Sequence, residues 1–259
     1  MPGTSVLLTP KWLAGHVLAL SLIVLFTTFG FWQLGRLGER QQANAVVAER
    51  MAGEAQPLGE LRERYGEEPD EWAYRRVTVR GRYDHGSEML LRSRSRDGQP
   101  GWHVLTPLVQ QSGMALLVDR GWVPYRMDDP PVEAASPPGG SVFLEGLVRA
   151  EQDPPEGWLS QFAPRDPEEG PLRTAYYVDV ERLAAQLPYP LEPVYLELSA
   201  QTPANEGTLP LPSQTPELER GSHLSYALQW FTFALIGVVG YGLLLRSTVQ
   251  SRRGAEKSQ

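Results

Sequence analysis

Apolar residues are concentrated in two long stretches near the ends of the chain. Residues 12–34 and 224–245 contain no Asp, Glu, Lys or Arg. With a rise of about 1.5 Å per residue, each stretch is long enough as a helix to cross the roughly 30 Å hydrocarbon core of a bilayer. A buried helix of a soluble protein rarely extends this far without a charge. The pattern therefore predicts two transmembrane helices.

The first stretch also has to be compared with a cleaved signal peptide. The nearest small-x-small cleavage motif is 43–45, which lies beyond the charges of Arg36 and Arg40. An uncleaved anchor agrees better with this spacing. Residues 35–63 are rich in Arg, Glu, Gln and Ala, and we expect them to continue the membrane helix until it ends near Pro57.

Between the two stretches the pattern changes to short β-branched or aliphatic runs that are separated by turn residues. Seven runs are predicted to be strands: 76–83, 88–94, 103–109, 115–120, 142–148, 175–180 and 194–198. The tripeptides 84–86 and 111–113 are expected to be hairpin turns between neighbouring strands.

The rest of this middle segment contains little regular structure. One short helix is predicted at 180–187, ending before Pro188, and three proline-rich segments are predicted to be extended loops: 128–140, 153–170 and 202–216. The predicted fold class is a membrane protein in which two transmembrane α-helices, 12–34 and 224–245, flank a mainly β (α+β) domain, 35–223.

The charges next to the two spans predict an orientation. The tail 246–259 contains four basic residues and one acidic residue, and the positive-inside rule places such a tail in the cytoplasm. Two spans then place the segment 1–11 in the cytoplasm as well, and the domain 35–223 outside. In a bacterium this means a multi-pass protein of the inner (plasma) membrane with a periplasmic domain. The part of the chain from the first span to the second has a net charge of −11, which is compatible with its translocation.

Composition excludes several kinds of chemistry. Lys and Arg number 24 against 31 Asp and Glu, a net charge of −7, which argues against binding to nucleic acid. The absence of cysteine excludes disulfides, thiolate nucleophiles, iron–sulfur clusters and covalent c-type haem attachment. The sequence contains no P-loop, no nucleophile elbow and no His-Glu-x-x-His motif. We therefore expect that the protein is not an enzyme.

The second span carries one stripe of residues at helical spacing. The stripe consists of His223, Ala227, Trp230, Ala234, Gly237 and Tyr241. Its small residues allow another helix to approach closely, so a helix-packing seam is one complete interpretation. The other is that the stripe faces a ligand or partner, with His223 as the reactive group. Both interpretations remain open at this point.

The outer ends of the two spans contain further polar and aromatic groups. Trp32, Gln33 and Arg36 end the first span at a depth similar to that of His223. Imidazole, cation and flat aromatic surface together suit an amphipathic porphyrin, through iron ligation, pairing with propionates and ring contact. His16 lies about 30 Å away by helix rise and cannot share that iron.

Four motifs resemble those of the Surfeit locus protein family, the cytochrome c oxidase assembly factors. They are Gly-Phe-Trp-Gln-Leu-Gly-Arg (30–36), Gly-Arg-Tyr-Asp (81–84), Thr-Pro-Leu to Arg-Gly-Trp-Val-Pro (106–124) and His-Leu-Ser-Tyr-Ala-Leu-Gln-Trp-Phe (223–231). The matches occur in the family's order and span most of the chain. Asp119 and Ser222 depart from the family, which usually has Asn at both positions, and both replacements keep a hydrogen-bonding side chain.

The resemblance implies a role in the maturation of haem–copper oxidase. It implies transient, non-covalent binding of haem a, with His223 as axial ligand of the iron. We expect the supporting residues of this site to be Trp230, Tyr226, Trp32, Gln33 and Arg36. The implied partners are oxidase subunit I, which carries the haem, and haem a synthase.

Two alternatives to this role are left by the sequence. One is a scaffold that stabilises assembly intermediates without touching haem, and another is a membrane-anchored enzyme whose catalytic group the sequence does not reveal.

Segment 120–124 also has two interpretations. It is either a strand end with a tight turn or a docking surface formed by Arg120, Gly121 and Trp122.

Overall fold

The computed structural model describes residues 7–66, 68–152, 154, 157–167, 170–214, 218–219 and 221–256. The chain forms two compact units: Met1–Val46 with Glu217–Gln259, and Val47–Pro216. The first unit is called the helix pair and the second the β domain. Residues 1–6 and 257–259 of the two predicted cytoplasmic segments, and parts of the predicted loops 153–170 and 202–216, lie outside the described residues.

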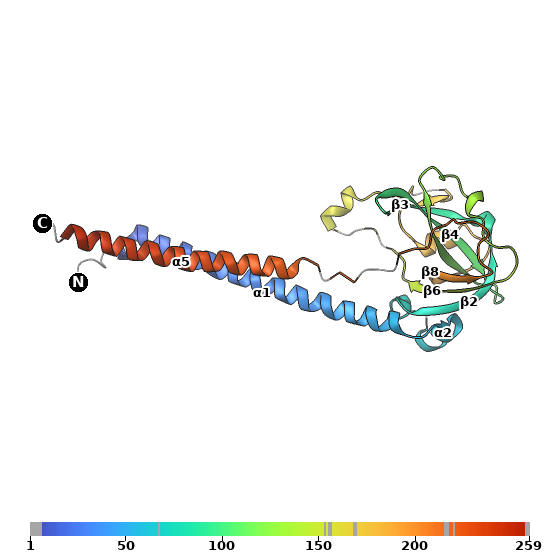
Figure 1. Cartoon of the computed structure of the whole chain (residues 1–259), viewed down its shortest axis with the longest axis horizontal. Helices are drawn as coiled ribbons and strands as arrows, with labels where there is room; N and C mark the ends of the chain where they lie inside the picture. Colours follow the sequence, from blue (N-terminus) through green and yellow to red (C-terminus); the bar gives the residue numbers. More distant parts are fainter. Residues whose placement is uncertain are drawn as a thin grey trace. The chain divides into compact units, whose positions relative to one another are not determined.

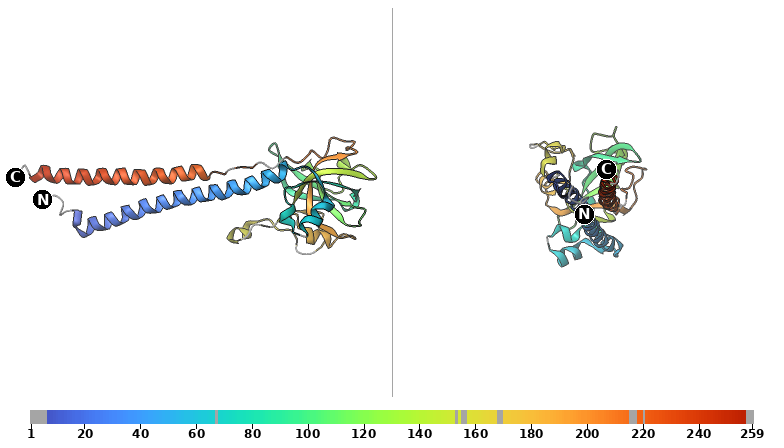
Figure 2. Two further views of the ribbon diagram at one scale, coloured as in Figure 1. Left: turned by 90° about the horizontal axis from the view of Figure 1, so that it is seen from below. Right: turned by 90° about the vertical axis from the view of Figure 1, so that its left-hand side faces the viewer.

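The helix pair is built from α1 (Pro10–Ala52) and α5 (His223–Glu256). The two helices run antiparallel, because α1 contacts α5 in reverse order: Gly15 lies near Tyr241, and Gln33 near His223. The start of α1 and the end of α5 therefore lie at the same end of the helix pair, as Figures 1 and 2 show.

Both helices are long and apolar enough to cross a membrane. In their most apolar windows only 11% and 6% of the residues are buried. The core helix of a soluble protein would be mostly buried, so these exposed apolar surfaces indicate membrane association. The prediction of two apolar helices that flank a mainly β domain is confirmed.

The first helix ends earlier than expected. α1 stops at Ala52, before Gly53, whereas the sequence predicted its end near Pro57. Glycine is a poor helix former, and the chain beyond it turns to pair β1 (Gln56–Pro57) with the strand that begins at Arg76. Two further helices follow that the sequence did not predict, α2 (Leu58–Tyr65) and α3 (Pro69–Trp72).

Most predicted strands are present in the β domain, some of them longer than expected. They are β2 (Arg76–Tyr83), β3 (Met89–Arg96), β4 (Gln99–Val109), β5 (Ala115–Pro124), β6 (Val142–Arg149) and β8 (Leu191–Thr202). The described loops of this domain contain the 3₁₀ turns η2 (His85–Ser87), η3 (Glu133–Ala135) and η4 (Gly157–Phe162).

The predicted strand 175–180 is wrong. Only β7 (Thr174–Ala175) forms there, and the chain then enters α4 (Val180–Ala184). The carboxylate of Asp179 accepts a hydrogen bond from the backbone N–H of Arg182, which caps this helix and ends any extended run before it.

The sheet closes on itself. Its strand order is β1-β2-β6-β8-β5-β4-β3-β7, and β2 also pairs with β4, through Arg82 with Val109 and Tyr83 with Leu108. Strands β2, β6, β8, β5 and β4 thus form a closed ring, in which only the β5–β8 pair is parallel. Closure removes the free edges of these five strands where they pair.

One of the two predicted hairpins is confirmed. Segment 111–113 connects the antiparallel neighbours β4 and β5. Segment 84–86 is no hairpin turn, because β2 pairs with β6 and β4 whereas β3 pairs with β4 and β7. The chain instead turns a corner here, where the carboxylate of Asp84 accepts hydrogen bonds from the hydroxyls of Ser87 and Tyr189.

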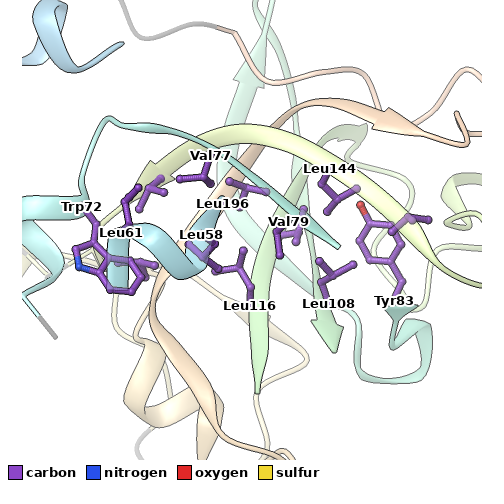
Figure 3. Close-up of a cluster of buried hydrophobic side chains, with 14 residues drawn as sticks. Leu58, Leu61, Trp72, Val77, Val79, Tyr83, Leu108, Leu116, Leu144 and Leu196 are labelled. Carbon is purple, nitrogen blue, oxygen red and sulfur yellow. The ribbon is translucent and has the colours of Figure 1, made fainter. Parts of the chain in front are cut away.

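The ring is filled by one hydrophobic cluster (Figure 3). Val77, Val79 and Tyr83 alternate along β2 and are buried, in keeping with the two-residue period of a strand. Leu61 of α2 and Trp72 of α3 are fully buried in the same cluster. The two helices thus close the core, and each such side chain contributes about 1.5–3 kcal/mol by burial. A second cluster, to which α4 contributes Leu183, packs on the opposite face of β5.

Candidate functional site

A hydrogen bond across the helix pair holds His223 in place. Nδ1 of His223 lies 2.9 Å from the amide oxygen Oε1 of Gln33. Because an amide oxygen only accepts, Nδ1 carries the proton in this arrangement and the lone pair of the neutral imidazole is at Nε2. None of the described residues forms a hydrogen bond with Nε2. The ring is half-buried, so this nitrogen is available as a ligand.

The stripe that begins at His223 faces α1. Ala227 and Ala234 are buried, and a Cβ added to Gly237 would lie 3.1 Å from Ile23. The hydroxyl of Tyr241 lies 2.5 Å from Nδ1 of His16. The helix-packing interpretation therefore accounts for the stripe below the level of His223.

On α1, the close approach of the two helices depends on a glycine. Gly30 is the buried residue of α1, and a Cβ there would lie 2.5 Å from the ring of Phe231. Only a residue without a side chain lets the two helices approach so closely at this level. The ring of Phe231 also contacts Phe31 at 5.3 Å in an edge-to-face arrangement.

Trp230 belongs to an aromatic cluster inside the helix pair. Its ring stacks on Phe26 at 5.7 Å and lies 5.0 Å from Phe29 and 5.9 Å from Phe233. The side chain is half-buried and lies seven residues, about two helical turns, from His223 along α5. Its main contacts are therefore with the helices themselves.

The remaining predicted haem residues are exposed. Trp32 is 56% exposed and Tyr226 is 49% exposed. Arg36 forms an ion pair of 2.6 Å with Glu39, its neighbour on the outer face of the helix. Exposed i,i+3 pairs contribute only a few tenths of a kcal/mol, so this guanidinium remains available to another anion.

Two nearby contacts tie the start of α5 to α1. The side chains of Arg40 and Asn44 donate hydrogen bonds of 3.4 and 3.0 Å to the carbonyl oxygen of Glu219. They lie two and three turns beyond Gln33 on α1. The entry to α5 is therefore held on the same side of α1 as His223.

Histidines outside this region have structural partners. His103 lies on β4, as predicted, and its Nδ1 is 2.7 Å from a carboxylate oxygen of Asp119. His85 lies at the corner after β2, with Nε2 3.7 Å from Glu88. No group of three or more potential metal-binding side chains occurs within the described ranges.

The predicted docking surface at 120–122 is wrong. The side chains of Arg120 and Trp122 are only 2% and 5% exposed, so they have no surface to offer a partner. Gly121 has a φ of +119°, and a Cβ there would lie 2.1 Å from the carbonyl oxygen of Leu211. Trp122 and Leu211 exchange two backbone hydrogen bonds at this point. The segment is thus the end of a strand, as the competing interpretation held, but it contains no tight turn, because β5 continues to Pro124.

One buried ion pair was not predicted from the sequence. Nη1 of Arg120 lies 3.2 Å from Oε2 of Glu88, and both side chains are fully buried. Burial raises the pKa of Glu88, although hydrogen bonds from Val132 and Thr106 and the charge of Arg120 oppose this. Burial likewise lowers the pKa of the Arg120 guanidinium. The sequence signal that could have indicated this buried pair is the position of Glu88 directly before the apolar run Met-Leu-Leu.

Comparison with known proteins agrees with the motifs. The sequence model of the SURF1 family matches residues 20–235. A SURF1-like protein of Caenorhabditis elegans is 31% identical over 247 residues, which cover 87% of this chain and 72% of that protein. A SURF1-like protein of Mycobacterium tuberculosis is 28% identical over 256 residues, 98% of this chain and 90% of the relative. Human Surfeit locus protein 1 is 28% identical over 232 residues, 81% of this chain and 71% of its own length.

Proposed function

The chain belongs to the SURF1 family, and from this premise we propose that it is an assembly factor for haem–copper cytochrome c oxidase. In this proposal it binds haem a transiently and assists its insertion into subunit I. The observation that carries the proposal is the pair His223 and Gln33, which leaves one imidazole nitrogen free at the end of an antiparallel helix pair.

The chemistry of the donor set fits a haem. Imidazole nitrogen is a common axial ligand of haem iron, and the second ring nitrogen usually donates to an oxygen that fixes the tautomer. Oε1 of Gln33 is such an oxygen, at 2.9 Å from Nδ1 of His223. When bound, haem a supplies an iron centre and two propionates.

The supporting residues divide by exposure. Trp32 and Tyr226 present exposed rings that can contact the porphyrin, and Arg36 is a cation for a propionate. Trp230 acts indirectly, because its ring is packed among Phe26, Phe29 and Phe233 and stiffens the helix pair next to the ligand.

Location and partners form part of the same proposal. The protein is a multi-pass protein of the bacterial inner membrane, with both termini in the cytoplasm and the β domain in the periplasm. It receives haem a from haem a synthase and passes it to subunit I, and it catalyses no reaction of its own. Reporter fusions test the topology: an active periplasmic reporter at the C-terminus would contradict it.

An absorption spectrum tests the haem assignment. The full-length protein is co-expressed with haem a synthesis, purified in detergent and examined for a Soret band. His223→Ala is expected to lose most of the bound haem, whereas His85→Ala, in the β domain, keeps it. Unchanged haem content in His223→Ala contradicts the assignment of the ligand.

A scaffold without haem is the second candidate, and one observation favours it. The small residues Ala227 and Ala234 are buried and Trp230 is surrounded by rings of the pair, so most of the stripe is already occupied by α1. Under this alternative the protein co-purifies with oxidase subunit I but never carries pigment, even when haem a synthesis is co-expressed.

A further inference from the structure

Strand β3 has an open edge in its second half. β7 pairs with β3 only through Leu90 and Leu91, and no described residue pairs with the same edge further on. On its other side, β3 continues its pairing with β4 up to Arg96 and Gln99, which flank the two-residue turn 97–98.

The turn determines which backbone groups face this edge. Both turn residues have positive φ, as in a type I′ hairpin, so Arg96 and Gln99 form a hydrogen-bonded pair and Ser95 and Pro100 a non-hydrogen-bonded one. Pro100 has no N–H and suits this position. The N–H and C=O of Ser95 therefore point away from β4, towards the open edge.

A cavity of about 370 Å³ lies beside this edge. Its lining includes Arg92, Arg94, Ser95, Trp102, Tyr125 and Tyr176. The ring of Tyr125 stacks on Trp102 at 5.1 Å with an angle of 8° between the planes, and it is 58% exposed. The cavity thus has a flat aromatic wall that is accessible from solvent.

Two half-buried arginines in this cavity have no acidic partner among the described residues. Nε and Nη2 of Arg92 donate to Oγ1 of Thr174 at 3.0 and 2.7 Å, and its guanidinium lies 5.4 Å from the ring centre of Trp102. Nη2 of Arg94 donates to Gln152 at 2.8 Å. Across the described part of the chain, neither arginine forms an ion pair, although the protein as a whole is acidic. Several N–H groups of both remain for an anion.

We propose that this edge binds an extended acidic peptide segment of a partner protein by strand addition. The backbone of the segment pairs with Ser95, a carboxylate of the segment binds between Arg92 and Arg94, and a neighbouring side chain packs on Tyr125. Strand addition takes its affinity from backbone hydrogen bonds and its specificity from pockets for alternate side chains, and this edge offers both. The competing explanation is that the arginines only protect an edge from aggregation.

Peptide binding to the full-length protein in detergent tests the proposal. The probe is a fluorescein-labelled hexapeptide in which Glu and Val alternate, and the readout is fluorescence anisotropy. We expect saturable binding that weakens as salt is raised, and no binding of the matching Lys–Val peptide. Absence of saturable binding of the Glu peptide up to about 1 mM, or equal binding of the Lys peptide, overturns the proposal.

Variants separate strand addition from simple charge attraction. Arg94→Gln is expected to weaken binding about tenfold or more, and Arg80→Gln, an exposed arginine on β2, to leave it unchanged. Ser95→Pro removes the outward N–H together with the hydroxyl and fixes φ, but it removes no hydrogen bond to β4. It is expected to abolish binding, because proline is tolerated on an edge but cannot pair there. If Ser95→Pro binds the peptide as well as the wild type does, strand addition is refuted.

Discussion

The hydroxyl of Tyr241 lies 2.5 Å from Nδ1 of His16 and joins the two helices about 27 Å along the pair from His223. Nε2 of His16 lies 3.0 Å from the carbonyl oxygen of Leu7. Both nitrogens of this imidazole are therefore engaged, Nε2 as a donor and Nδ1 as an acceptor. His16 connects the helices, whereas His223 keeps Nε2 free.

Replacement of His16 separates these two roles. His16→Ala removes the contact with Tyr241 and is expected to lower the stability of the helix pair by about 0.6–1.7 kcal/mol, the range for hydrogen bonds between membrane helices. Haem content is expected to stay at the wild-type level. Thermal unfolding in detergent and the Soret absorbance measure the two effects, and a His16→Ala protein without haem would show that the two sites are not independent.

Gln33 is expected to control the affinity for haem through the orientation of His223. Gln33→Leu removes the acceptor of the Nδ1 proton, so the imidazole loses its fixed orientation and haem binding is expected to weaken about 10- to 100-fold. A haem titration followed at the Soret band measures this. Gln42→Leu, at an exposed position of the same helix, is the matched control and should bind haem as the wild type does.

Gly30 is expected to tolerate no side chain. Gly30→Ala places a methyl group 2.5 Å from the ring of Phe231, so the helices must move apart and the melting temperature of the helix pair should fall. The double variant Gly30→Ala with Phe231→Ala removes the collision and should recover part of the loss. An additive effect of the two substitutions would contradict this explanation.

Glu88 and Arg120 are expected to depend on each other for the stability of the β domain. Glu88→Gln leaves the buried guanidinium without its counter-charge and should lower the free energy of unfolding of the β domain by about 3–5 kcal/mol. The double variant Glu88→Gln with Arg120→Met should be more stable than the single one. Glu133→Gln, at an exposed position, serves as the control in thermal unfolding followed by circular dichroism.

Asp84 predicts a pH dependence of stability. Burial acts to raise its pKa, but hydrogen bonds from Tyr189 and Ser87 outweigh it and hold the pKa below the ordinary value. A lowered folded pKa stabilises the protein above the unfolded pKa of about 4, and this stabilisation is lost as pH falls further. Tyr189→Phe should therefore cost about 1 kcal/mol at neutral pH, with the difference shrinking below pH ~4. Tyr177→Phe is the control, and a constant difference at all pH values would contradict the assignment.

Local patterns accounted for most strands and both long helices. β2 alternates between buried and exposed residues, and the glycine-containing segment 111–113 is the turn that its composition indicated. The pairing of β2 with β4 had no local signal, because ring closure depends on register between segments about 26 residues apart. For the same reason α2 was not predicted: its apolar face matters only once the ring exists to receive Leu61.

The candidate site was anticipated in position but not in detail. Charge and spacing placed Gln33 and His223 at one level, and they are joined there by a hydrogen bond. The packing of Trp230 among phenylalanines was not expected, because the sequence pattern of an aromatic residue on a helix stripe is the same whether its side chain faces a ligand or another ring. Burial of Arg120 was missed because its partner Glu88 lies on a different strand end, 32 residues away.

The position of β8 in the ring has a consequence for biogenesis. β8 lies between β6 and β5 and is the last of the described strands, so the ring stays open until residues 191–202 have been made. Until then β5 and β6 each expose an edge to other nascent chains. The second membrane helix begins only about 20 residues later, and its synthesis follows almost at once. A truncation before β8 therefore leaves an unsealed, aggregation-prone sheet, and one near the start of α5 leaves a sealed ring on a single membrane anchor.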